Sequence, residues 1–360
     1  MKALVAYALN QMGVEEVELD PPKASEIQIR MAAAGVCHSD LSALNGTIPV
    51  EFPLVLGHEG AGVVEAVGEG VTHVKPGDHV VMSFVPNCGT CFHCLRNEAY
   101  LCRSTPRGGT MVDGTRRLHW KGEPLGAFIS LGNMAERVVC PAMNVVSVPK
   151  EIPLRVAALI GCGVTTGVGA AIHTARVTPG STVAVFGCGG VGIAVIQGAR
   201  IAGAARIIAV DVSEPKLEMA MRFGATEAFS AEGAQEQILK ATGKIGVDFA
   251  FEAIGKPEVV EAAIKVTRRG GTTVVVGVGK LGDQIRVDAF TFPLSGKTLR
   301  GCIFGSANPR EDFPRLLDLY RAGRLDLEGM VTRTYTIDEG PEAFADLEKG
   351  VNARGVIVFD

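Results

Sequence analysis

One short segment constrains the fold of this 360-residue chain more than any other. The apolar run Thr182–Phe186 leads directly into a glycine-rich turn, and the run Val191–Ala202 follows with the length of a helix. This order of strand, G-x-G-x-x-G turn and helix is typical of a dinucleotide-binding βαβ unit, in which glycines let a pyrophosphate approach the helix N-terminus. The residues predicted to contact the dinucleotide are Gly187, Gly189, Gly190, Val191 and Gly192.

An acidic residue at the end of the next strand candidate, Ala205–Val210, extends this prediction. Asp211 follows Gly192 by 19 residues, a spacing at which a carboxylate accepts hydrogen bonds from the adenosine ribose hydroxyls. A carboxylate at this position would repel a 2′-phosphate, and no arginine follows it directly. The sequence therefore favours NAD over NADP.

The pattern of elements predicts two domains. After residue 160, strand and helix candidates alternate, which indicates a doubly wound parallel sheet; they include the helix Glu214–Phe223 with Ser213 as its N-cap, the strand Val247–Glu252, the helix Pro257–Val266 and the strand Thr272–Val276. Before residue 160, short strand candidates separated by Gly, Pro and Asp predict an irregular, barrel-like domain; they are Ala3–Ala8, Ile27–Ala33, Gly62–Val67, His79–Phe84 and Glu136–Val139. Helices near 312–322 and 340–349 and a final strand, Gly355–Phe359, are expected at the C-terminal end.

Charge and hydropathy argue against some classes of partner. The formal net charge is −4 and no run of Lys or Arg stands out, so neither nucleic acid nor an anionic membrane is an expected partner. No secretory signal is recognised at the N-terminus. Residues 156–175 and 177–199 lack charge and are long enough to span a bilayer, but Pro179 and the glycines after it favour a buried strand and helix of a soluble protein.

Four of the nine cysteines form a compact cluster with the pattern C-x2-C-x2-C-x7-C: Cys88, Cys91, Cys94 and Cys102. Without a secretory signal, such clustering favours a metal over disulfides. The spacing predicts a tetrahedral zinc site that is closed by four thiolates and is therefore structural. An iron–sulfur cluster is the alternative for such spacing.

A second candidate metal set is dispersed: Cys37, His58 and Cys162. Two Cys and one His leave a fourth position for water or substrate, which is typical of a catalytic zinc. From the spacing alone, two buried cysteines and a core histidine are an equal alternative.

Together these motifs resemble those of the zinc-dependent medium-chain alcohol dehydrogenases, and above all the liver-type long form related to glutathione-dependent formaldehyde dehydrogenase. The segments that carry the resemblance are GVCHSD (35–40), GHEGAG (57–62), the four-cysteine lobe, IGCGVTTG (160–167), VFGCGGVG (185–192), DVSEPK (211–216), FEAIG (251–255), VVGVG (275–279) and CIFG (302–305). The resemblance implies an α/β architecture: a GroES-like irregular β-barrel catalytic domain, 1–163 and 304–360, with a structural-zinc lobe at 86–104, and a Rossmann NAD-binding domain, 164–303.

The resemblance also implies roles for single residues. Cys37, His58 and Cys162 would bind the catalytic zinc, with Glu59 just behind it, and Asp40 would orient His58. Ser39 would take the proton from the alcohol. The implied cofactor contacts are Asp211 and Lys216 at the adenosine ribose, His38 and Arg354 at the pyrophosphate, and Val278 at the nicotinamide. The implied substrate pocket is lined by Phe84, Phe128 and Ile303.

The activity implied is reversible hydride transfer between an alcohol and NAD, with two zinc ions per subunit, in a cytoplasmic homodimer or homotetramer. The predicted pocket is apolar, so we expect primary alcohols with aliphatic or aromatic tails. Three departures from the family bear on this. Ser42 stands where many relatives have a His that releases the proton, and His38 replaces an Arg of some relatives. Ile48 and its neighbours lack the acidic residue that glutathione-dependent relatives place at the pocket mouth, which disfavours a thiol adduct of formaldehyde. There are three alternatives: a formaldehyde dehydrogenase that acts on a thiol adduct, an alcohol dehydrogenase with tightly bound NAD, and a non-catalytic protein that binds NAD and zinc.

Overall fold

The structure is a computed structural model that describes residues 1–104, 106 and 108–359. The chain divides into two compact units, which are described separately. The first comprises Met1–Cys162, Asn308–Ala322 and Leu327–Asp360, and the second comprises Gly163–Ala307 and Gly323–Asp326. The second unit therefore continues four residues beyond the expected boundary at 303 and includes a short return segment before residue 327.

The first unit is built mainly of strands. Its strands are β1 (Lys2–Ala8), β2 (Gln11–Glu16), β3 (Glu18–Leu19), β4 (Glu26–Gly35), β5 (Leu54–Val55), β6 (Gly60–Val67), β7 (His79–Met82), β8 (Leu118–Trp120), β9 (Glu123–Ala127), β10 (Arg137–Pro141), β11 (Val145–Ser147), β18 (Val331–Tyr335) and β19 (Arg354–Val358). Its helices are α1 (His38–Leu44), α2 (Leu154–Ala157), α9 (Pro309–Arg321) and α10 (Gly340–Lys349).

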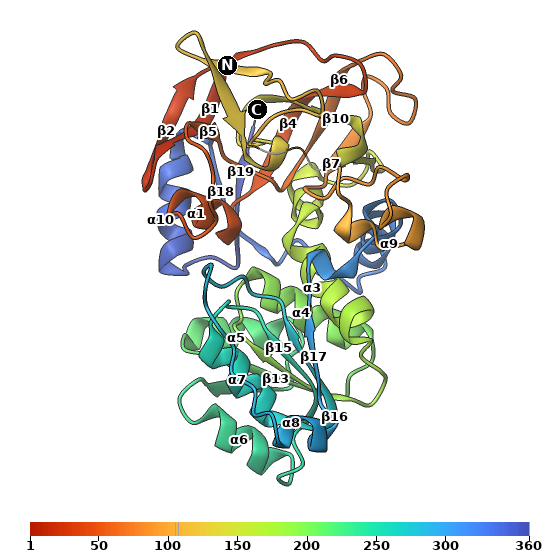
Figure 1. The fold of residues 1–360 in the computed structure, drawn as a ribbon, viewed down its shortest axis with the longest axis vertical. Coiled ribbons are helices and arrows are strands. Elements are labelled where there is room, and N and C mark those ends of the chain that lie inside the picture. The colour runs from red at the N-terminus through yellow and green to blue at the C-terminus, as the bar shows by residue number, and fades with distance from the viewer. Residues whose placement is uncertain (105, 107, 360) are drawn as a thin grey trace. The chain divides into compact units, whose positions relative to one another are not determined.

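Two sheets share the core of the first unit. One has the strand order β11-β7-β6-β4-β19-β18 with β10 on β4, and the other has the order β2-β1-β5-β9-β8-β3. Strand β19, from the C-terminal end of the chain, pairs with β4 through Val356 and Gly35, so that red and blue ribbons lie side by side in this unit (Figure 1). This pairing carries residue 354 to the end of β4, where the metal cluster described below lies.

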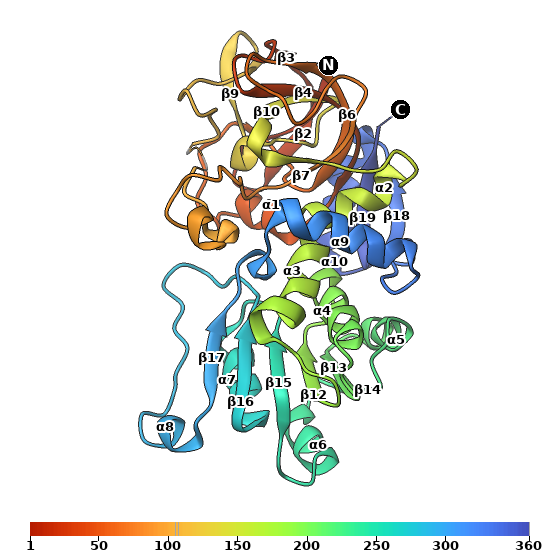
Figure 2. The same cartoon turned by 90° about the vertical axis from the view of Figure 1, so that its right-hand side faces the viewer.

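The second unit is a parallel six-stranded sheet with flanking helices (Figure 2). The strand order is β14-β13-β12-β15-β16-β17, and all five neighbouring pairs are parallel. Its elements are α3 (Gly163–Gly169), β12 (Thr182–Phe186), α4 (Gly190–Ile201), β13 (Arg206–Asp211), α5 (Glu214–Arg222), β14 (Glu227–Ser230), α6 (Ala234–Ala241), β15 (Val247–Glu252), α7 (Pro257–Val266), β16 (Thr267–Val275), α8 (Thr291–Ser295) and β17 (Thr298–Gly301).

Side chains alternate between the two faces of the sheet along β12 and β13, and this alternation shows which residues share one face. Ala184 and Phe186 of β12 join Ile208 and Val210 of β13 in one apolar cluster, and α6 and α7 add Ala234, Ile238, Ala263 and Val266 to it. Helices α6 and α7 therefore cover that face. The doubly wound sheet expected from the sequence is confirmed. Helix α6 was missed because it buries only Ala234 and Ile238 and is otherwise polar.

The uncharged segments 156–175 and 177–199 are long enough in sequence to cross a membrane. Among the described residues, however, no single helix is both long and apolar enough to cross a bilayer. One bent pair of helices, 154–161 and 163–175, satisfies length and composition together.

Candidate functional site

Four potential metal ligands from separate parts of the first unit meet in one buried cluster. Ligand atoms of Cys37, His58, Glu59 and Cys162 all lie within 4.8 Å of one another. Cys37 immediately precedes α1, His58 and Glu59 form the turn before β6, and Cys162 follows the short helical turn Ala158–Gly161. The structure thus brings together the dispersed candidate ligands, for which the sequence spacing alone left two equal alternatives. Cys37, His58 and Cys162 form one cluster and are not separate residues of the hydrophobic core.

Asp40 holds His58 in a fixed orientation. Its Oδ2 lies 3.1 Å from His58 Nδ1, and its Oδ1 accepts a hydrogen bond of 2.9 Å from the backbone N–H of Gly57. Gly57 has φ +104, and a Cβ there would collide with Asn133 and Met134, so this turn requires glycine. The other ring nitrogen, Nε2, lies 3.2 Å from Cys162 Sγ and so faces the cluster.

Glu59 forms an ion pair that sequence reasoning did not find. Its Oε1 accepts a hydrogen bond from Arg354 Nη2, although the two residues lie 295 positions apart in the chain. Burial raises the pKa of Glu59 to about 7, even though Arg354 opposes this shift. Arg354 is only 4% exposed, and its predicted contact with the pyrophosphate remains a prediction. No local pattern could have revealed this pair, because the β4–β19 pairing creates it.

The chemistry of the donors fits a cation. Hydrogen bonding between the two buried thiols lowers the pKa of Cys37 and raises that of Cys162. Thiols bind a metal as thiolates, so a cation would compete with protons for these two sulfur atoms. Two thiols and one imidazole are the donors that zinc prefers, and three such ligands leave a fourth position open. Ser39 is half-buried, and its Oγ lies 3.9 Å from Cys37 Sγ, beside the cluster.

Two predicted pocket residues flank the His58 ring. Phe84 and Phe128 meet it edge-on, with ring centroids 5.8 and 5.6 Å away. Phe128 also lines a cavity of about 470 Å³ together with Ile48, Leu54 and Ile129. The third predicted residue, Ile303, belongs to the second unit and is 46% exposed.

One expectation about this pocket is wrong. The same cavity is lined by Glu51, three residues after Ile48, so an acidic group does lie near the predicted pocket mouth. Pro49 and Val50 also line the cavity, so the whole segment from Ile48 to Glu51 runs along it. The argument against a thiol-adduct substrate is thereby removed.

The four-cysteine lobe forms a second metal cluster, and its ligand atoms also lie within 4.8 Å of one another. Cys88 and Cys94, and likewise Cys91 and Cys102, have Sγ atoms 3.9 Å apart. That distance is close to about 3.8 Å, the edge of a tetrahedron with zinc–sulfur bonds of about 2.3 Å. An iron–sulfur cluster binds its thiolates to different irons and so needs wider spacing. The geometry favours a single tetrahedral ion.

The glycine-rich turn joins β12 to α4 within the second unit. Gly187 has φ +92, and a Cβ on Gly192 would collide with the carbonyl oxygen of Gly187, so both positions require glycine. A Cβ on Gly189 would meet no atom within 4 Å, which leaves its backbone accessible to a ligand. Gly190 and Val191 begin α4, where unpaired N–H groups favour an anion.

Asp211 closes this turn from the end of β13. Its Oδ2 accepts a hydrogen bond of 2.8 Å from Cys188 N–H, and its Oδ1 accepts one of 3.0 Å from Ser213 N–H. Lys216 is half-buried on α5, and Val278, after β16, is 68% exposed. His38, in the first unit, is exposed at the start of α1. Their contacts with NAD remain predictions.

Three cysteines lie outside both clusters. Cys140 and Cys188 are buried, as expected of small apolar side chains. Cys302, which the sequence alone suggests is a small buried apolar residue like the other two, is only half-buried and accepts a hydrogen bond from Thr174 Oγ1 at 3.3 Å.

A family model described as the alcohol dehydrogenase GroES-like domain matches residues 23–150, and one described as zinc-binding dehydrogenase matches residues 190–322. The chain is 44% identical to the putative alcohol dehydrogenase D of Mycobacterium tuberculosis, over 95% of each chain. It is 44% identical to the NDMA-dependent alcohol dehydrogenase of Amycolatopsis methanolica, over 99% of this chain and 98% of that protein. The crystal structure of benzyl alcohol dehydrogenase from Acinetobacter calcoaceticus superposes with a TM-score of 0.94 at 32% identity, covering 100% of this chain and 99% of that one.

The chain belongs to the zinc-dependent medium-chain alcohol dehydrogenase family. The expected pairing of a GroES-like domain with a Rossmann-type domain is confirmed, and so is the expectation of an NAD-dependent zinc oxidoreductase that acts on alcohols. The non-catalytic alternative is set aside.

Proposed function

We propose that this enzyme oxidises primary alcohols with apolar tails to aldehydes, and that its reacting centre is the cluster of Cys37, His58 and Cys162. The observation that supports this most is the apolar setting of His58. Phe84 and Phe128 flank its ring. Phe128 also lines a cavity of about 470 Å³, a volume within the range of small-molecule sites. The printed name of the benzyl alcohol dehydrogenase neighbour agrees with an aromatic tail.

In the proposed mechanism, zinc when bound supplies a Lewis acid that makes an alcohol hydroxyl more acidic, and NAD supplies the hydride acceptor. Cys37, His58 and Cys162 would hold the zinc. Asp40 fixes the His58 ring so that Nε2 faces the cluster. Ser39 Oγ, beside Cys37, would accept the hydroxyl proton and pass it toward water or His38, because Ser42 cannot titrate near neutral pH.

We also assign structural and cofactor roles. Cys88, Cys91, Cys94 and Cys102 would hold a second zinc that stabilises a lobe with little regular structure. The turn Gly187–Gly192 would bind the pyrophosphate, and Asp211 and Lys216 would bind the adenosine ribose. The domain boundaries are proposed as 1–163 with 304–360, and 164–303.

A homodimer formed through the NAD-binding units is part of the proposal. Strand β17 is an edge strand of the second unit's sheet, and the segment before it exposes Phe290 by 75% and Leu294 by 61%. An uncovered strand edge beside exposed apolar side chains favours pairing with a second copy. We propose a cytoplasmic location as well, because thiol ligands stay reduced there.

The alcohol substrate is tested by NADH formation. Purified zinc-loaded enzyme is given NAD and, separately, ethanol, octanol, benzyl alcohol, and formaldehyde with a low-molecular-weight thiol. The proposal predicts a kcat/KM that rises with the size of the apolar tail. A faster reaction with thiol and formaldehyde than with every alcohol would contradict it.

A second candidate is an enzyme that keeps NAD bound and passes electrons to another compound. One observation favours it: a relative with 44% identity is named an NDMA-dependent alcohol dehydrogenase. This candidate predicts NAD that co-purifies in equal amount with the protein and turnover with NDMA but without added NAD. Protein that elutes free of NAD and turns over only when NAD is added would contradict it.

A further inference from the structure

We propose that the second unit carries a separate binding site for a small anion on an apolar tail, either a carboxylate or a phosphate monoester. The site is a cavity of about 490 Å³, a volume within the range of small-molecule sites. Its lining residues all lie between 261 and 297, within the second unit. The inference goes beyond the proposed function, because none of these residues belongs to a metal cluster or to the glycine-rich turn.

One part of the cavity wall is apolar. Ile264 comes from the last turn of α7, Val287 from the segment before α8, and Phe292 from α8 itself. Val287 is 38% exposed, and the other two side chains are half-buried. A tail that covers these three side chains would remove apolar surface from water, which favours binding.

Three cations line the same cavity: Lys265, Arg286 and Lys297. Among the residues that the structure describes, none of the three forms an ion pair with a carboxylate. Lys297 is the most enclosed of them, and its Nζ donates to the carbonyl oxygen of Ile264 at 2.7 Å. Burial lowers the pKa of Lys297, and no acidic group opposes this shift. A partly buried ammonium of this kind would be stabilised by an anionic partner.

Two carboxylates also line the cavity, but backbone N–H groups engage both of them. Glu261 Oε1 accepts a hydrogen bond of 3.0 Å from the backbone N–H of Arg286. Asp288 Oδ1 accepts one of 2.6 Å from the backbone N–H of Thr291. These bonds hold the segment before α8 against α7 and fix the start of α8. The carboxylates therefore shape the cavity, and the three cations outnumber them.

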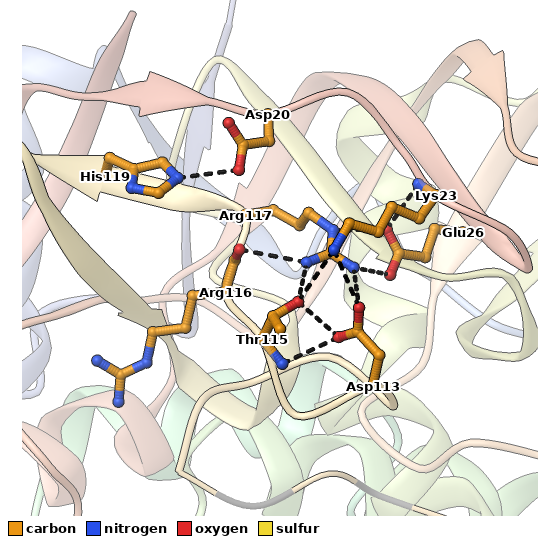
Figure 3. A network of polar contacts seen from close by, with 8 residues as sticks. All are labelled: Asp20, Lys23, Glu26, Asp113, Thr115, Arg116, Arg117 and His119. Atoms are coloured by element: carbon orange, nitrogen blue, oxygen red, sulfur yellow. Dashed lines mark hydrogen bonds and ion pairs between the residues drawn. The ribbon is translucent and has the colours of Figure 1, made fainter.

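A polar network of the first unit provides a contrast. There, Arg117 donates to Glu26 at 2.9 and 2.6 Å (Figure 3). Asp113 accepts a hydrogen bond of 2.8 Å from Arg117 and pairs with Lys23 at 3.2 Å. Arg117 and Lys23 thus each have a carboxylate partner from the chain itself. The cations of the cavity have no such partner in the described part of the chain, which favours an anion supplied by a ligand.

Helix α8 separates the cavity from the surface that we assign to the contact with a second copy. Phe292 and Ser295 line the cavity, whereas Phe290 and Leu294 are exposed. By helical periodicity, residues 290 and 294 share the face opposite to 292 and 295. A ligand in the cavity would therefore contact one face of α8 and leave the other face for the second copy.

Isothermal titration calorimetry tests the proposal with zinc-loaded enzyme that is kept saturated with NAD, so that the pyrophosphate site is filled. Octanoate, octyl phosphate, inorganic phosphate and octyltrimethylammonium are titrated separately. We expect at least one of the two tailed anions to bind, inorganic phosphate to bind more weakly because it lacks a tail, and the tailed cation not to bind. The tighter of the two tailed anions identifies the anionic group.

Replacing the cations locates the site. Lys297→Met and Lys265→Gln should each weaken binding of the tailed anion by about 5- to 10-fold, the loss expected for one charge-assisted contact. Lys297→Arg, which keeps the charge, should lose less. Lys23→Met is the matched control, because Lys23 is an exposed cation of the first unit with a partner of its own. Its affinity for the anion should equal that of wild type.

Cys37→Ser distinguishes the cavity from the proposed reacting centre, where a carboxylate could also bind. The proposal predicts that this variant binds the tailed anion as wild type does. An affinity lost in Cys37→Ser but kept in Lys297→Met would place the anion at the reacting centre and overturn the proposal. Wild-type affinity in both Lys297→Met and Lys265→Gln, or no binding of either tailed anion to wild type, would overturn it as well. None of these readouts depends on turnover, so they decide this inference whatever alcohol the enzyme oxidises.

Discussion

The Oδ2 of Asp40 lies 3.1 Å from Nδ1 of His58, and both side chains are almost completely inaccessible to solvent, at 0% and 1% exposure. A second pair of the same chemistry, Asp20 and His119, has a similar distance of 2.9 Å but is exposed. In the buried pair, Asp40 orients His58, which is a candidate metal ligand. In the exposed pair, His119 belongs to neither of the two metal clusters. The two pairs therefore form a natural comparison.

We predict that Asp40→Asn lowers zinc affinity at the Cys37 cluster by about 10- to 100-fold, as is usual when the partner of a metal-bound histidine is replaced. The amide can donate to Nδ1 and so stabilise the wrong tautomer. Zinc retained against a chelator, measured by atomic absorption, checks this. Asp20→Asn should retain zinc as wild type does, and equal retention by both variants would contradict the assigned role of Asp40.

The four-cysteine lobe should affect stability and not the alcohol-binding centre. Replacing Cys94 by Ser should remove one zinc ion per subunit and lower the melting temperature, because the lobe has few regular elements to hold it. Differential scanning calorimetry with metal analysis measures both effects. Cys302→Ser, a half-buried thiol of the second unit, should lose no zinc. An unchanged zinc content in Cys94→Ser would refute the assignment.

Glu252 is a buried carboxylate with a positioning role in the second unit. Its Oε1 accepts hydrogen bonds from Ile254 N–H at 2.8 Å and Gly255 N–H at 2.6 Å. Gly255 in turn packs against the backbone of Val278, the predicted nicotinamide contact. Glu252→Ala should lower the free energy of unfolding by about 2–3 kcal/mol, because it leaves two N–H groups without their acceptor. Glu252→Gln, which keeps the carbonyl acceptor, should lose less, and the exposed Glu258→Gln should lose nothing measurable.

The same residue predicts a pH dependence. Burial raises the pKa of Glu252 above its ordinary value, although the N–H groups of Gly255 and Ile254 oppose this. Between the unfolded and folded pKa values, the folded state holds a proton that the unfolded state has lost. The stability contributed by this group is therefore present at low pH and is lost as the pH rises through the folded pKa. The stability difference between wild type and Glu252→Gln should shrink from acidic to neutral pH in urea titrations, and a constant difference would contradict the prediction.

Cofactor choice should depend on Asp211. Asp211→Asn removes the charge that repels a 2′-phosphate and weakens hydrogen bonds to the ribose, so NAD affinity should fall by about tenfold and the preference for NAD over NADP should narrow. Cofactor titration of intrinsic fluorescence measures both dissociation constants. Asp318→Asn, an exposed acid on α9, serves as the control. A variant that still binds NAD and NADP in the wild-type ratio would remove Asp211 from the site.

The sequence predicted the parallel sheet well, because buried strands, the glycine turn and helix stops are local signals. It also placed both cysteine sets, although only the fold shows that Cys37, His58 and Cys162 meet. It missed the pair of Glu59 with Arg354 and the position of Glu51 in the pocket. Both depend on how distant segments pack: the first on strand β19 joining β4, and the second on the segment from Ile48 to Glu51 lying against residues 126–129 to form the cavity. Neither relationship has a local pattern.

The central claim is that the Cys37, His58 and Cys162 cluster is the zinc centre at which alcohol is oxidised. Native mass spectrometry of wild type and Cys37→Ser, run beside NADH formation from benzyl alcohol, tests it most directly. The account predicts two zinc ions per subunit and turnover in wild type, and one zinc ion, an unchanged circular dichroism spectrum and no turnover in the variant. A Cys37→Ser protein that keeps both zinc ions, or oxidises benzyl alcohol at the wild-type rate, would contradict it.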